Sequence, residues 1–316
     1  MASALAKRAV AGLVRALPMR VRKGLLRELC GTAAPRDAYA AFQQLGRRFG
    51  ITDVLVPGDY GEIEGALADT AILATYAQTR RWSAHLAQVA GEFFADHTGG
   101  SYLDIGANIG LTTIPVARQG TITCKAFEPE PRTFRYLEGN LRRNCTAGNV
   151  ETFNLALSDR CGTIAFELAD DNLGDNRIRL TDRDGSFGEA ARRVITVPTD
   201  RLDDVLRRDA LDAPIAVKLD IQGAECRALA GGRAVLDEAA LFTCEFWPYG
   251  IRRLDSDPEQ LVAFVAERFA SGAILEGERE DAPIWQPIAE IADRLRQFAR
   301  AGADAPYATC ELLARK

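Results

Sequence analysis

The stretch YLDIGANIG (residues 102–110) decides the fold of this chain, because it reads as a strand that runs into a glycine-rich turn. The strand ends on Asp104, and Gly106, Asn108 and Gly110 then follow at alternate positions. In open α/β sheets, ligands bind beyond the carboxyl ends of the strands, where such a turn lies. The turn therefore predicts a ligand site, and the polar groups around it must indicate which ligand.

The composition is that of an ordinary globular chain, with 316 residues, 47% hydrophobic residues and 26% charged residues. A net charge of −5 gives no global basic field, so we expect no nucleic-acid partner. The seven cysteines form no CxxC pair, which is typical of reduced thiols. With no uncharged apolar run near the roughly 20 residues of a membrane span, and no signal peptide, the sequence predicts a cytoplasmic protein.

Residues 1–27 differ from the rest, because they hold seven basic residues and no acidic residue. Apolar residues recur there at helical spacing, which predicts a basic amphipathic helix that Pro18 breaks in two. One interpretation is a helix packed on its own domain. The other is a contact surface, either for a peripheral attachment to an anionic membrane or for a second copy in a homo-oligomer.

The remaining pattern divides at about residue 98. Residues 1–98 predict a mostly helical extension, with a strand at 51–57 and helices near 62–78 and 82–96. Residues 99–316 alternate strands and helices, which predicts a doubly wound, mostly parallel sheet. An insertion at 160–200 holds an antiparallel strand at 162–168 and a polar loop at 169–192. We expect the main strands at 101–106, 121–129, 150–159, 215–223, 240–246, 273–277 and 307–314, and helices at 111–118, 132–144, 225–236, 258–270 and 287–300.

The order Asp-x-Gly-x-Asn-x-Gly differs from the GxGxxG turn of nicotinamide-binding proteins. A carboxylate at Asp104 would repel a pyrophosphate and attract a cation. S-adenosylmethionine carries a sulfonium and an ammonium, has no phosphate, and has one carboxylate that a helix N-terminus could receive. The turn thus favours S-adenosylmethionine over a nicotinamide cofactor.

Glu128 follows Gly106 by 22 residues, at the end of the second predicted strand. An acidic residue about 20 residues after the turn grips the ribose hydroxyls of an unphosphorylated adenosine. Pro129 is placed to lie flat on the adenine. Ser158 and Asp159, at the end of the third strand, are placed to bond the adenine edge, with a simple turn or helix cap as the alternative.

Four motifs together resemble the FkbM family of class I S-adenosylmethionine-dependent methyltransferases. They are YLDIGANIGLTT, AFEPEPRTFRYLEGNLRRN, NLALSDRCG and VKLDIQGAECRALAGG, and they cover about residues 100–250 in the family's order and spacing. The resemblance implies a Rossmann-like, seven-stranded sheet with a terminal antiparallel hairpin. It also implies methyl transfer, most often to a hydroxyl oxygen of a sugar or another small-molecule natural product, which leaves S-adenosylhomocysteine.

The resemblance also assigns residues to the donor. Asp104, Gly106, Asn108 and Gly110 would wrap its methionine part, with Thr113 at the end of the same motif. Glu128 would hold the ribose. The family's later motif usually reads Asp-x-Glu-Gly-x-Glu, whereas this chain has Asp220, Gln222 and Glu225. Gln222 can position a ligand by hydrogen bonds but cannot accept a proton as a base.

Methyl transfer to an alcohol needs a group that takes up the alcohol's proton. The two histidines, His85 and His97, lie outside any motif, so carboxylates are the better candidates. We expect Asp220, Glu225 and Glu245 to supply the base, each at or just after a strand end. Asp220 could instead contact the ammonium of the donor or cap the helix 225–236, and Glu225 could be a first-turn acid that the helix dipole favours.

Trp247 and Tyr249 could stack on a sugar ring or pack in the core. The three carboxylates Asp220, Glu225 and Glu245 could also hold a divalent cation, although the missing carboxylate at 222 disfavours it. The rival functions are an N-methyltransferase acting on an amine and a donor-binding protein without catalysis.

Overall fold

A computed structural model of the protein describes residues 4–22, 25, 35–275, 282–301 and 305–316. The chain divides into two units, one formed by Met1–Trp82 with Asp170–Gly174 and the other by Ser83–Ala169 with Asp175–Lys316. All residues that the sequence predicts to bind the donor or the acceptor lie in the second unit.

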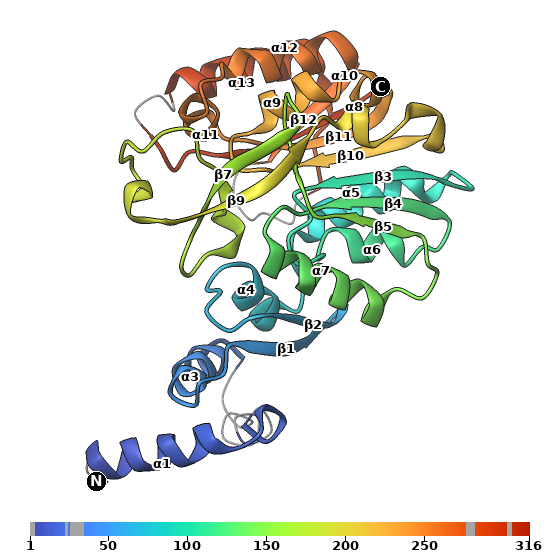
Figure 1. The fold of residues 1–316 in the computed structure, drawn as a ribbon. Helices are drawn as coiled ribbons and strands as arrows, with labels where there is room; N and C mark the ends of the chain where they lie inside the picture. Colours follow the sequence, from blue (N-terminus) through green and yellow to red (C-terminus); the bar gives the residue numbers. More distant parts are fainter. Residues whose placement is uncertain (1–3, 23–24, 26–34, 276–281, 302–304) are drawn as a thin grey trace. The chain divides into compact units, whose positions relative to one another are not determined.

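A large sheet forms the centre of the second unit, with the strand order β13-β12-β14-β11-β10-β3-β4-β5 (Figure 1). The neighbouring strands β11, β10, β3, β4 and β5 run parallel to one another. Strand β14 lies between β11 and β12 and is antiparallel to both. Strand order reverses between β3 and β10, so the carboxyl ends of these two strands mark the switch point where ligands bind. The strands are β3 (Gly100–Ile105), β4 (Ile122–Phe127), β5 (Val150–Phe153), β10 (Ile215–Leu219), β11 (Ala239–Phe246), β12 (Ser271–Leu275), β13 (Gln286–Pro287) and β14 (Cys310–Arg315).

This topology confirms the Rossmann-like, mostly parallel sheet and its terminal antiparallel pair β12 and β14. The two-residue β13 adds an edge strand that the sequence does not predict. The predicted third strand at 150–159 is too long, because the chain leaves the large sheet after β5. There the side chain of Asn154 donates to the carbonyl oxygens of Glu128 (2.9 Å) and Pro129 (3.1 Å), which turns the chain away from the sheet.

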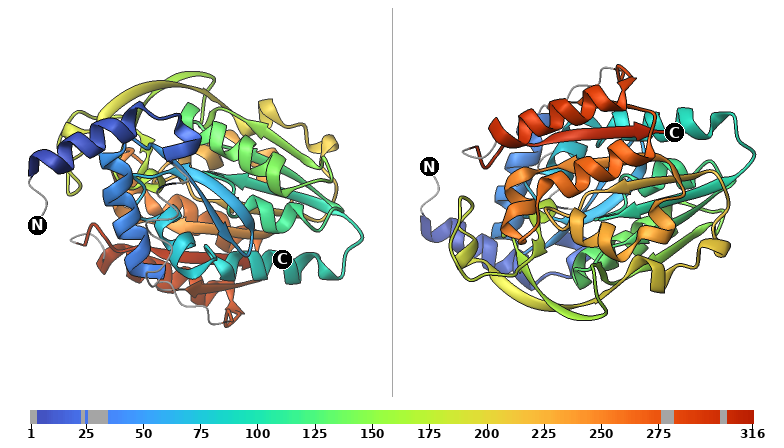
Figure 2. Two further views of the ribbon diagram at one scale, coloured as in Figure 1. Left: turned by 90° about the horizontal axis from the view of Figure 1, so that it is seen from below. Right: turned by 90° about the horizontal axis from the view of Figure 1, so that it is seen from above.

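Helices cover both faces of the large sheet. On one face, α5 (Ala84–Ala95) and α6 (Thr113–Ala117) pack against buried residues such as Tyr102 and Leu241. Residues 84–95, which the sequence pattern groups with the N-terminal extension, therefore belong to the second unit. On the other face, α12 (Pro258–Arg268) and α13 (Ile288–Ala301) lie side by side, in orange and red on the right of Figure 2.

Shorter helices complete the unit. The expected helix at 225–236 is two helices, α9 (Glu225–Gly231) and α10 (Arg233–Leu236), interrupted at Gly232, since glycine is a poor helix former. Helix α7 (Pro131–Asn144) begins with a proline, and Glu130 caps it by accepting the N–H of Thr133 (2.6 Å). The others are α8 (Leu202–Val205) and α11 (Pro248–Arg253).

The inserted segment forms a second sheet with the order β6-β9-β7-β8. Its strands are β6 (Ala156–Leu157), β7 (Gly162–Leu168), β8 (Arg177–Ile178) and β9 (Arg193–Asp200). Strand β7 pairs antiparallel with β9, which confirms the predicted added strand. The polar stretch after β7 contains β8 and the 3₁₀ helix Glu189–Ala191, so it is not an irregular loop throughout.

In the first unit the strand predicted at 51–57 is confirmed, whereas the helix predicted near 62–78 is wrong in its first half. Strand β1 (Asp53–Gly58) pairs antiparallel with β2 (Gly61–Ala66), and helix α4 (Ile72–Thr79) begins ten residues later than predicted. The sequence GEIEGA alternates buried and more exposed residues, which is the period of a strand. Helix α3 (Pro35–Arg48) precedes this hairpin.

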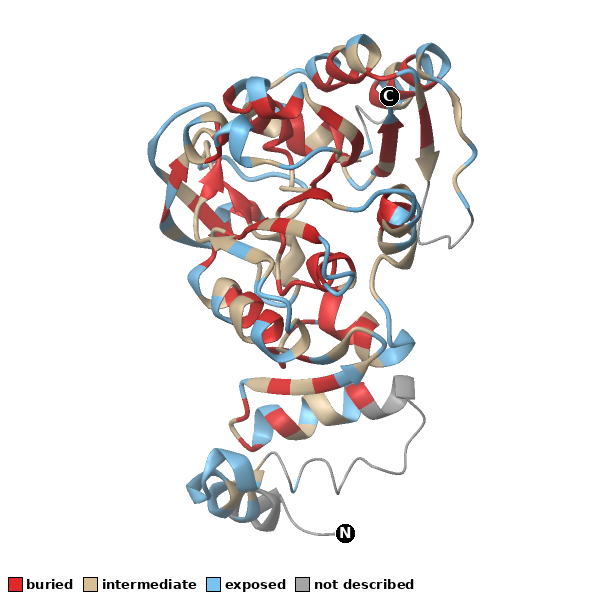
Figure 3. Ribbon diagram, turned by 90° about the vertical axis from the view of Figure 1, so that its right-hand side faces the viewer, coloured by how far each residue is buried: buried red, intermediate tan, exposed pale blue. Residues whose placement is uncertain are grey.

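The basic N-terminal segment forms α1 (Ala4–Ala16), stops at Leu17–Pro18 and is helical again at 19–22, which confirms the break at Pro18. Residues 1–3, 23–24 and 26–27 of the predicted segment lie outside the described residues. Arg15 donates to the carbonyl oxygen of Arg48 (2.7 Å), at the end of α3. In Figure 3 the described part of α1, beside the N label, is largely exposed. Among the described residues, none of the helices combines the length and apolar character needed to cross a bilayer.

Candidate donor and acceptor site

The glycine turn lies at the carboxyl end of β3, beside the loop that follows β10. Gly106 has a φ of +86°, and a Cβ there would lie 1.9 Å from the backbone oxygen of Asp220. Only glycine therefore lets the two loops approach this closely. Asn108 also adopts a left-handed φ of +50°, and its side-chain oxygen accepts the N–H of Ile109 (2.8 Å). The predicted glycine turn thus lies directly against the loop that follows β10.

Asp104 lies beneath this turn and is fully buried. Its Oδ2 accepts the hydroxyl groups of Thr112 (2.7 Å) and Thr113 (2.6 Å). Its Oδ1 lies 3.4 Å from the Nζ of Lys218, on the neighbouring strand β10. The cation that Asp104 attracts is therefore an internal lysine. Asp104 and Thr113 support the turn from below.

Glu128 follows β4 and has the properties expected of a ribose ligand. Its carboxylate accepts the backbone N–H groups of Asn108 (3.2 Å) and Glu130 (2.8 Å). In the described part of the chain, no basic side chain forms an ion pair with it, and burial raises its pKa to about 8. A buried carboxylate with spare acceptor capacity fits the paired hydroxyls of a ribose, so the residues present fit S-adenosylmethionine.

The residues expected at the adenine edge are partly engaged with each other. Ser158 donates to Asp159 Oδ1 (2.9 Å), and the same oxygen lies 3.0 Å from Arg227 on α9. Pro129 stays half-buried, with its carbonyl oxygen held by Asn154. Pro129 and Ser158 remain candidates for the adenine, whereas the Asp159 carboxylate already has a cationic partner.

A second group of polar side chains lies at the carboxyl ends of β10 and β11. The Nε2 of Gln222 donates to Asp220 Oδ1 (2.9 Å) and to Glu245 Oε2 (2.8 Å). The hydroxyl of Thr309 donates to the other oxygen of Glu245 (3.1 Å). Burial first, and then the nearby carboxylates, raise the pKa of Glu245 well above its usual range. The amide of Gln222 therefore bridges two of the three carboxylates that the sequence predicts as bases.

Glu225, the third of these carboxylates, braces the loop. It is fully buried, and its Oε1 accepts the N–H groups of Ile221 (3.1 Å) and Gly223 (3.2 Å). Burial raises its pKa to about 7. These contacts stabilise the turn in which Gln222 has a left-handed φ of +56°. Gln222 thus connects Asp220 to Glu245, whereas Glu225 stabilises the backbone of the loop from within.

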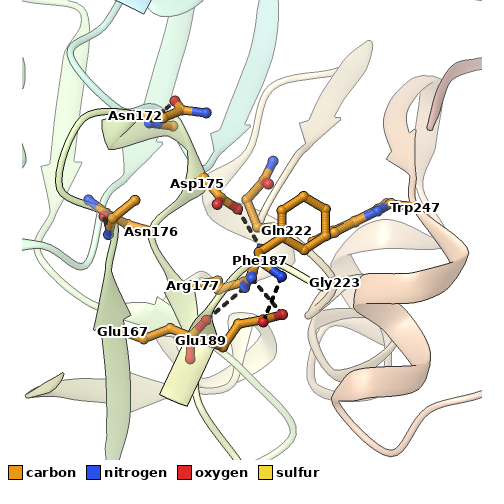
Figure 4. A network of polar contacts seen from close by, with 12 residues as sticks. Glu167, Asn172, Asp175, Asn176, Arg177, Phe187, Glu189, Gln222, Gly223 and Trp247 are labelled. Carbon is orange, nitrogen blue, oxygen red and sulfur yellow. Dashed lines mark hydrogen bonds and ion pairs between the residues drawn. The ribbon is translucent and has the colours of Figure 1, made fainter. Parts of the chain in front are cut away.

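The second sheet carries a buried arginine that the sequence analysis did not single out. Arg177 donates to Glu167 (2.9 Å), Asp175 (2.5 Å) and Glu189 (3.1 Å), and it is almost completely buried (Figure 4). Its neighbour Arg192 also pairs with Asp175. These contacts hold β7, β8 and the 3₁₀ helix together and give the inserted segment a fixed shape.

The same guanidinium lies over two aromatic rings, Phe187 at 5.4 Å and Trp247 at 5.0 Å. The hydroxyl of Tyr249 donates to Glu189 (2.8 Å). Trp247 and Tyr249 therefore pack against the buried ion pairs, which agrees with the core-packing alternative and not with stacking on a sugar ring. Trp247 immediately precedes α11, and Tyr249 lies on it. The same helix packs against the loop that carries Gln222, because a Cβ at Gly223 would lie 2.4 Å from the backbone of Gly250. The arginine cluster thus supports the loop that carries Gln222.

Sequence reasoning missed Lys218, Glu311 and Arg177. The signal for Lys218 was present, because a charged residue interrupts the apolar strand IAVKL. The histidines lie elsewhere: His85 is on α5, and His97 precedes β3 at its amino end. Within the described residues, no three metal-ligating side chains lie close enough together to hold an ion.

The sheet order, the glycine turn and Glu128 define a class I, Rossmann-like methyltransferase that uses S-adenosylmethionine. Residues 104–267 match the family model of the methyltransferase FkbM domain. The chain belongs to this family, which confirms the resemblance seen in the sequence motifs.

Two curated relatives are also methyltransferases. The 2-O-methyltransferase NoeI of Sinorhizobium fredii is 28% identical over 158 residues, which are 46% of this chain and 62% of NoeI. The hexuronic acid methyltransferase AglP of Haloferax volcanii is 25% identical over 178 residues, which are 56% of this chain and 66% of AglP. The chain therefore matches less than two thirds of the length of either relative. Among solved structures, M. jannaschii TYW2 in complex with AdoMet is 14% identical, with a TM-score of 0.38, and the match covers 84% of this chain and 85% of TYW2.

Proposed function

We propose that this chain transfers a methyl group from S-adenosylmethionine to a hydroxyl oxygen of a sugar, a glycan or another small-molecule acceptor. The observation that carries the proposal is the pair of carboxylates, Asp220 and Glu245, which the amide of Gln222 bridges at the strand ends. An alcohol is a weak nucleophile, so a group near the donor must take up its proton. The names of the relatives NoeI and AglP support an oxygen of a sugar as the acceptor atom.

When bound, S-adenosylmethionine supplies a sulfonium methyl group, whose C–S bond breaks as the new O–C bond forms, leaving S-adenosylhomocysteine. The chain aligns the reactants and accepts the proton. We assign Asp220 as the proton acceptor, because its side chain is 38% exposed and is therefore open to an acceptor hydroxyl. Both oxygens of Glu245 accept hydrogen bonds, so Glu245 orients Gln222 and with it Asp220.

The test is a methyl-transfer assay with labelled S-adenosylmethionine and three acceptor probes. The probes are p-nitrophenyl β-D-glucuronide, p-nitrophenyl β-D-glucoside and glucosamine, which offer an acidic sugar, a neutral sugar and an amine. We expect label in a sugar ether and a strong loss of transfer in Asp220→Asn. Transfer to the amine with little effect of Asp220→Asn would instead favour an N-methyltransferase, which needs less proton removal. Donor binding without turnover of any acceptor in a wider extract screen would favour a non-catalytic protein.

Glu128→Gln is expected to weaken S-adenosylmethionine binding by about tenfold, or about 1.4 kcal/mol, because an amide replaces a carboxylate that accepts the ribose hydroxyls. Titration calorimetry measures the affinity. Glu151→Gln is the control, since Glu151 pairs with Lys125 on the neighbouring strand, away from the turn. Equal affinities of the two variants for S-adenosylmethionine would show that Glu128 does not bind the donor.

We also propose that the basic N-terminal segment attaches the protein to an anionic membrane surface. Three apolar side chains lie along one side of the segment and stay exposed, namely Val10 (56%), Leu13 (72%) and Leu17 (37%). Residues 1–27 carry seven basic groups and no acidic group, which complements anionic lipid headgroups. Apolar contact and charge complementarity together favour a lipid surface over a second copy of the same basic segment.

Flotation with vesicles tests this attachment. We expect the full chain to bind vesicles that contain phosphatidylserine, and to bind phosphatidylcholine vesicles at least several-fold less well. Leu13→Glu is expected to abolish binding. The matched control is Val194→Glu, because Val194 is an exposed apolar residue (43%) in the second unit. Concentration-dependent dimerisation that Leu13→Glu removes, without vesicle binding, would instead assign the surface to a homo-oligomer.

A further inference from the structure

A row of polar side chains crosses the large sheet next to its carboxyl edge. Asp104 on β3 stands opposite Lys218 on β10, and Glu245 on β11 stands opposite Glu311 on β14. Lys218 is in register with Thr243, which lies two residues before Glu245. Residues two apart on a strand share a face, so all of these side chains project from the same face of the sheet. The row runs from the donor turn to the acceptor carboxylates.

Lys218 occupies the middle of this row. Its ammonium donates to the carbonyl oxygen of Gly106 (2.6 Å) and lies 3.4 Å from Asp104 and 3.7 Å from Asp220. The side chain is only 4% exposed. Burial alone lowers the pKa of Lys218, but Asp220, Asp104 and Glu311 raise it above its ordinary value, so the lysine stays charged.

Glu311 stands at the far end of the row. Its Oε1 is buried and accepts no hydrogen bond in the described structure. Burial and then the charge of Asp220 raise its pKa to about 8, and the charge of Lys218 acts in the opposite direction. The protonation of Glu311 therefore reports on the presence of the lysine charge.

We propose that Lys218 is a positioning residue that fixes the donor turn to the acceptor loop. Its ammonium holds the turn through the Gly106 carbonyl, and it balances the carboxylates of Asp104, Asp220 and Glu311 at the same time. The part that concerns Asp220 rests on the proposed function, whereas the part that concerns the donor turn does not. A lysine in this place acts on donor affinity without touching the donor.

A simpler role for Lys218 is to neutralise the buried Asp104. The two roles are separated by comparing Lys218→Met, Asp104→Asn and the double variant Asp104→Asn/Lys218→Met. Lys218→Met alone leaves the buried Asp104 without its cation and is expected to destabilise the fold. The test does not depend on that variant, because the double variant removes both charges. The matched control is Lys125→Met, since Lys125 is also a strand lysine paired with a carboxylate, at 2.6 Å from Glu151.

Binding of S-adenosylhomocysteine by calorimetry is the first measurement. We expect the double variant to bind at least tenfold more weakly than Asp104→Asn, because the Gly106 carbonyl has lost its donor, and Lys125→Met to bind within twofold of the parent. Circular dichroism checks the fold of each variant. Equal affinities of Asp104→Asn and the double variant would overturn the proposal and leave Lys218 as a counter-charge alone.

Titration of carboxyl-labelled glutamate by NMR is the second measurement, with Glu311→Gln to assign the signal. The Glu311 signal is expected to titrate near pH 8 in the parent and at least one unit higher in the double variant, with no shift in Lys125→Met. An unmoved Glu311 signal would show that Lys218 does not reach the acceptor end of the row. Neither measurement needs a methyl acceptor, so a failed sugar assay would leave this result intact.

Discussion

Arg177→Met is expected to lower the free energy of unfolding by about 3–5 kcal/mol, because it removes the most deeply buried cation of the cluster and leaves its three carboxylates with only Arg192 and Arg253. Glu167 and Glu189 are buried as deeply as Arg177 itself, and each accepts one of its N–H groups. Asp175 accepts a third. Methionine fills much of the volume but donates no hydrogen bond, so the loss comes from the stranded charges and not from a cavity.

Urea unfolding followed by circular dichroism measures this effect. The control is Arg207→Met, since Arg207 pairs with Asp209 in a fully exposed position and its loss should leave the unfolding midpoint unchanged. Arg177→Lys keeps the charge but loses the planar fork, so its stability should lie between those of the parent and Arg177→Met. If Arg177→Met unfolded at the midpoint of Arg207→Met, the buried ion pairs would not stabilise the inserted segment.

The fold could be predicted because its main signals are local. Strand β3, the glycine turn and Glu128 lie within 30 residues of sequence, and the alternation of strands and helices continues to the C-terminus. Strand β1 agrees with the strand predicted at 51–57, but β2 lies where the sequence predicts a helix, because it is short and only its pairing with β1 makes it stable. Local patterns indicate element type well where an element is long and periodic.

The partners within the site depend on tertiary register, which one sequence does not reveal. Asp104 was expected to meet a cationic ligand, and the required cation is Lys218, which lies 114 positions later and reaches it only because β3 and β10 are neighbours. Glu311 joins the row only because β14 pairs antiparallel with β11. The residue types therefore indicate which polar groups gather at this edge of the sheet, while the strand order determines which of them pair with one another.

Gln222→Glu is expected to lower the free energy of unfolding by about 2–4 kcal/mol at about pH 8 in the absence of divalent cations. The Gln222 amide donates to both Asp220 and Glu245, and an ionised carboxylate in its place has no hydrogen to donate. The new carboxylate would then stand beside Asp220 and Glu245, at a place where burial and neighbouring carboxylates already raise the pKa of Glu245.

The loss should disappear on acidification, and the sign follows from the raised pKa of Glu245. A carboxyl group whose pKa is higher in the folded state than in the unfolded state stabilises the fold when it is protonated. That stability is fully present below the unfolded value of about 4.5 and is lost as the pH rises through the folded value. A third carboxylate increases the stability that is lost over this pH range. In acid, the new carboxyl group is protonated and can donate a hydrogen bond as the amide does. We therefore expect the variant to approach the parent at about pH 5.

Divalent cations provide the second half of the test, because three carboxylates in place of two and an amide form an oxygen-rich site. Urea unfolding at about pH 8, with a chelator or with millimolar Mg²⁺ or Ca²⁺, should show a cation-dependent gain in Gln222→Glu. Gln222→Met, which is neutral, should show neither the pH dependence nor the cation gain. A parent that gained as much from the cation as Gln222→Glu would contradict this prediction, because the site would then bind the cation without a carboxylate at position 222.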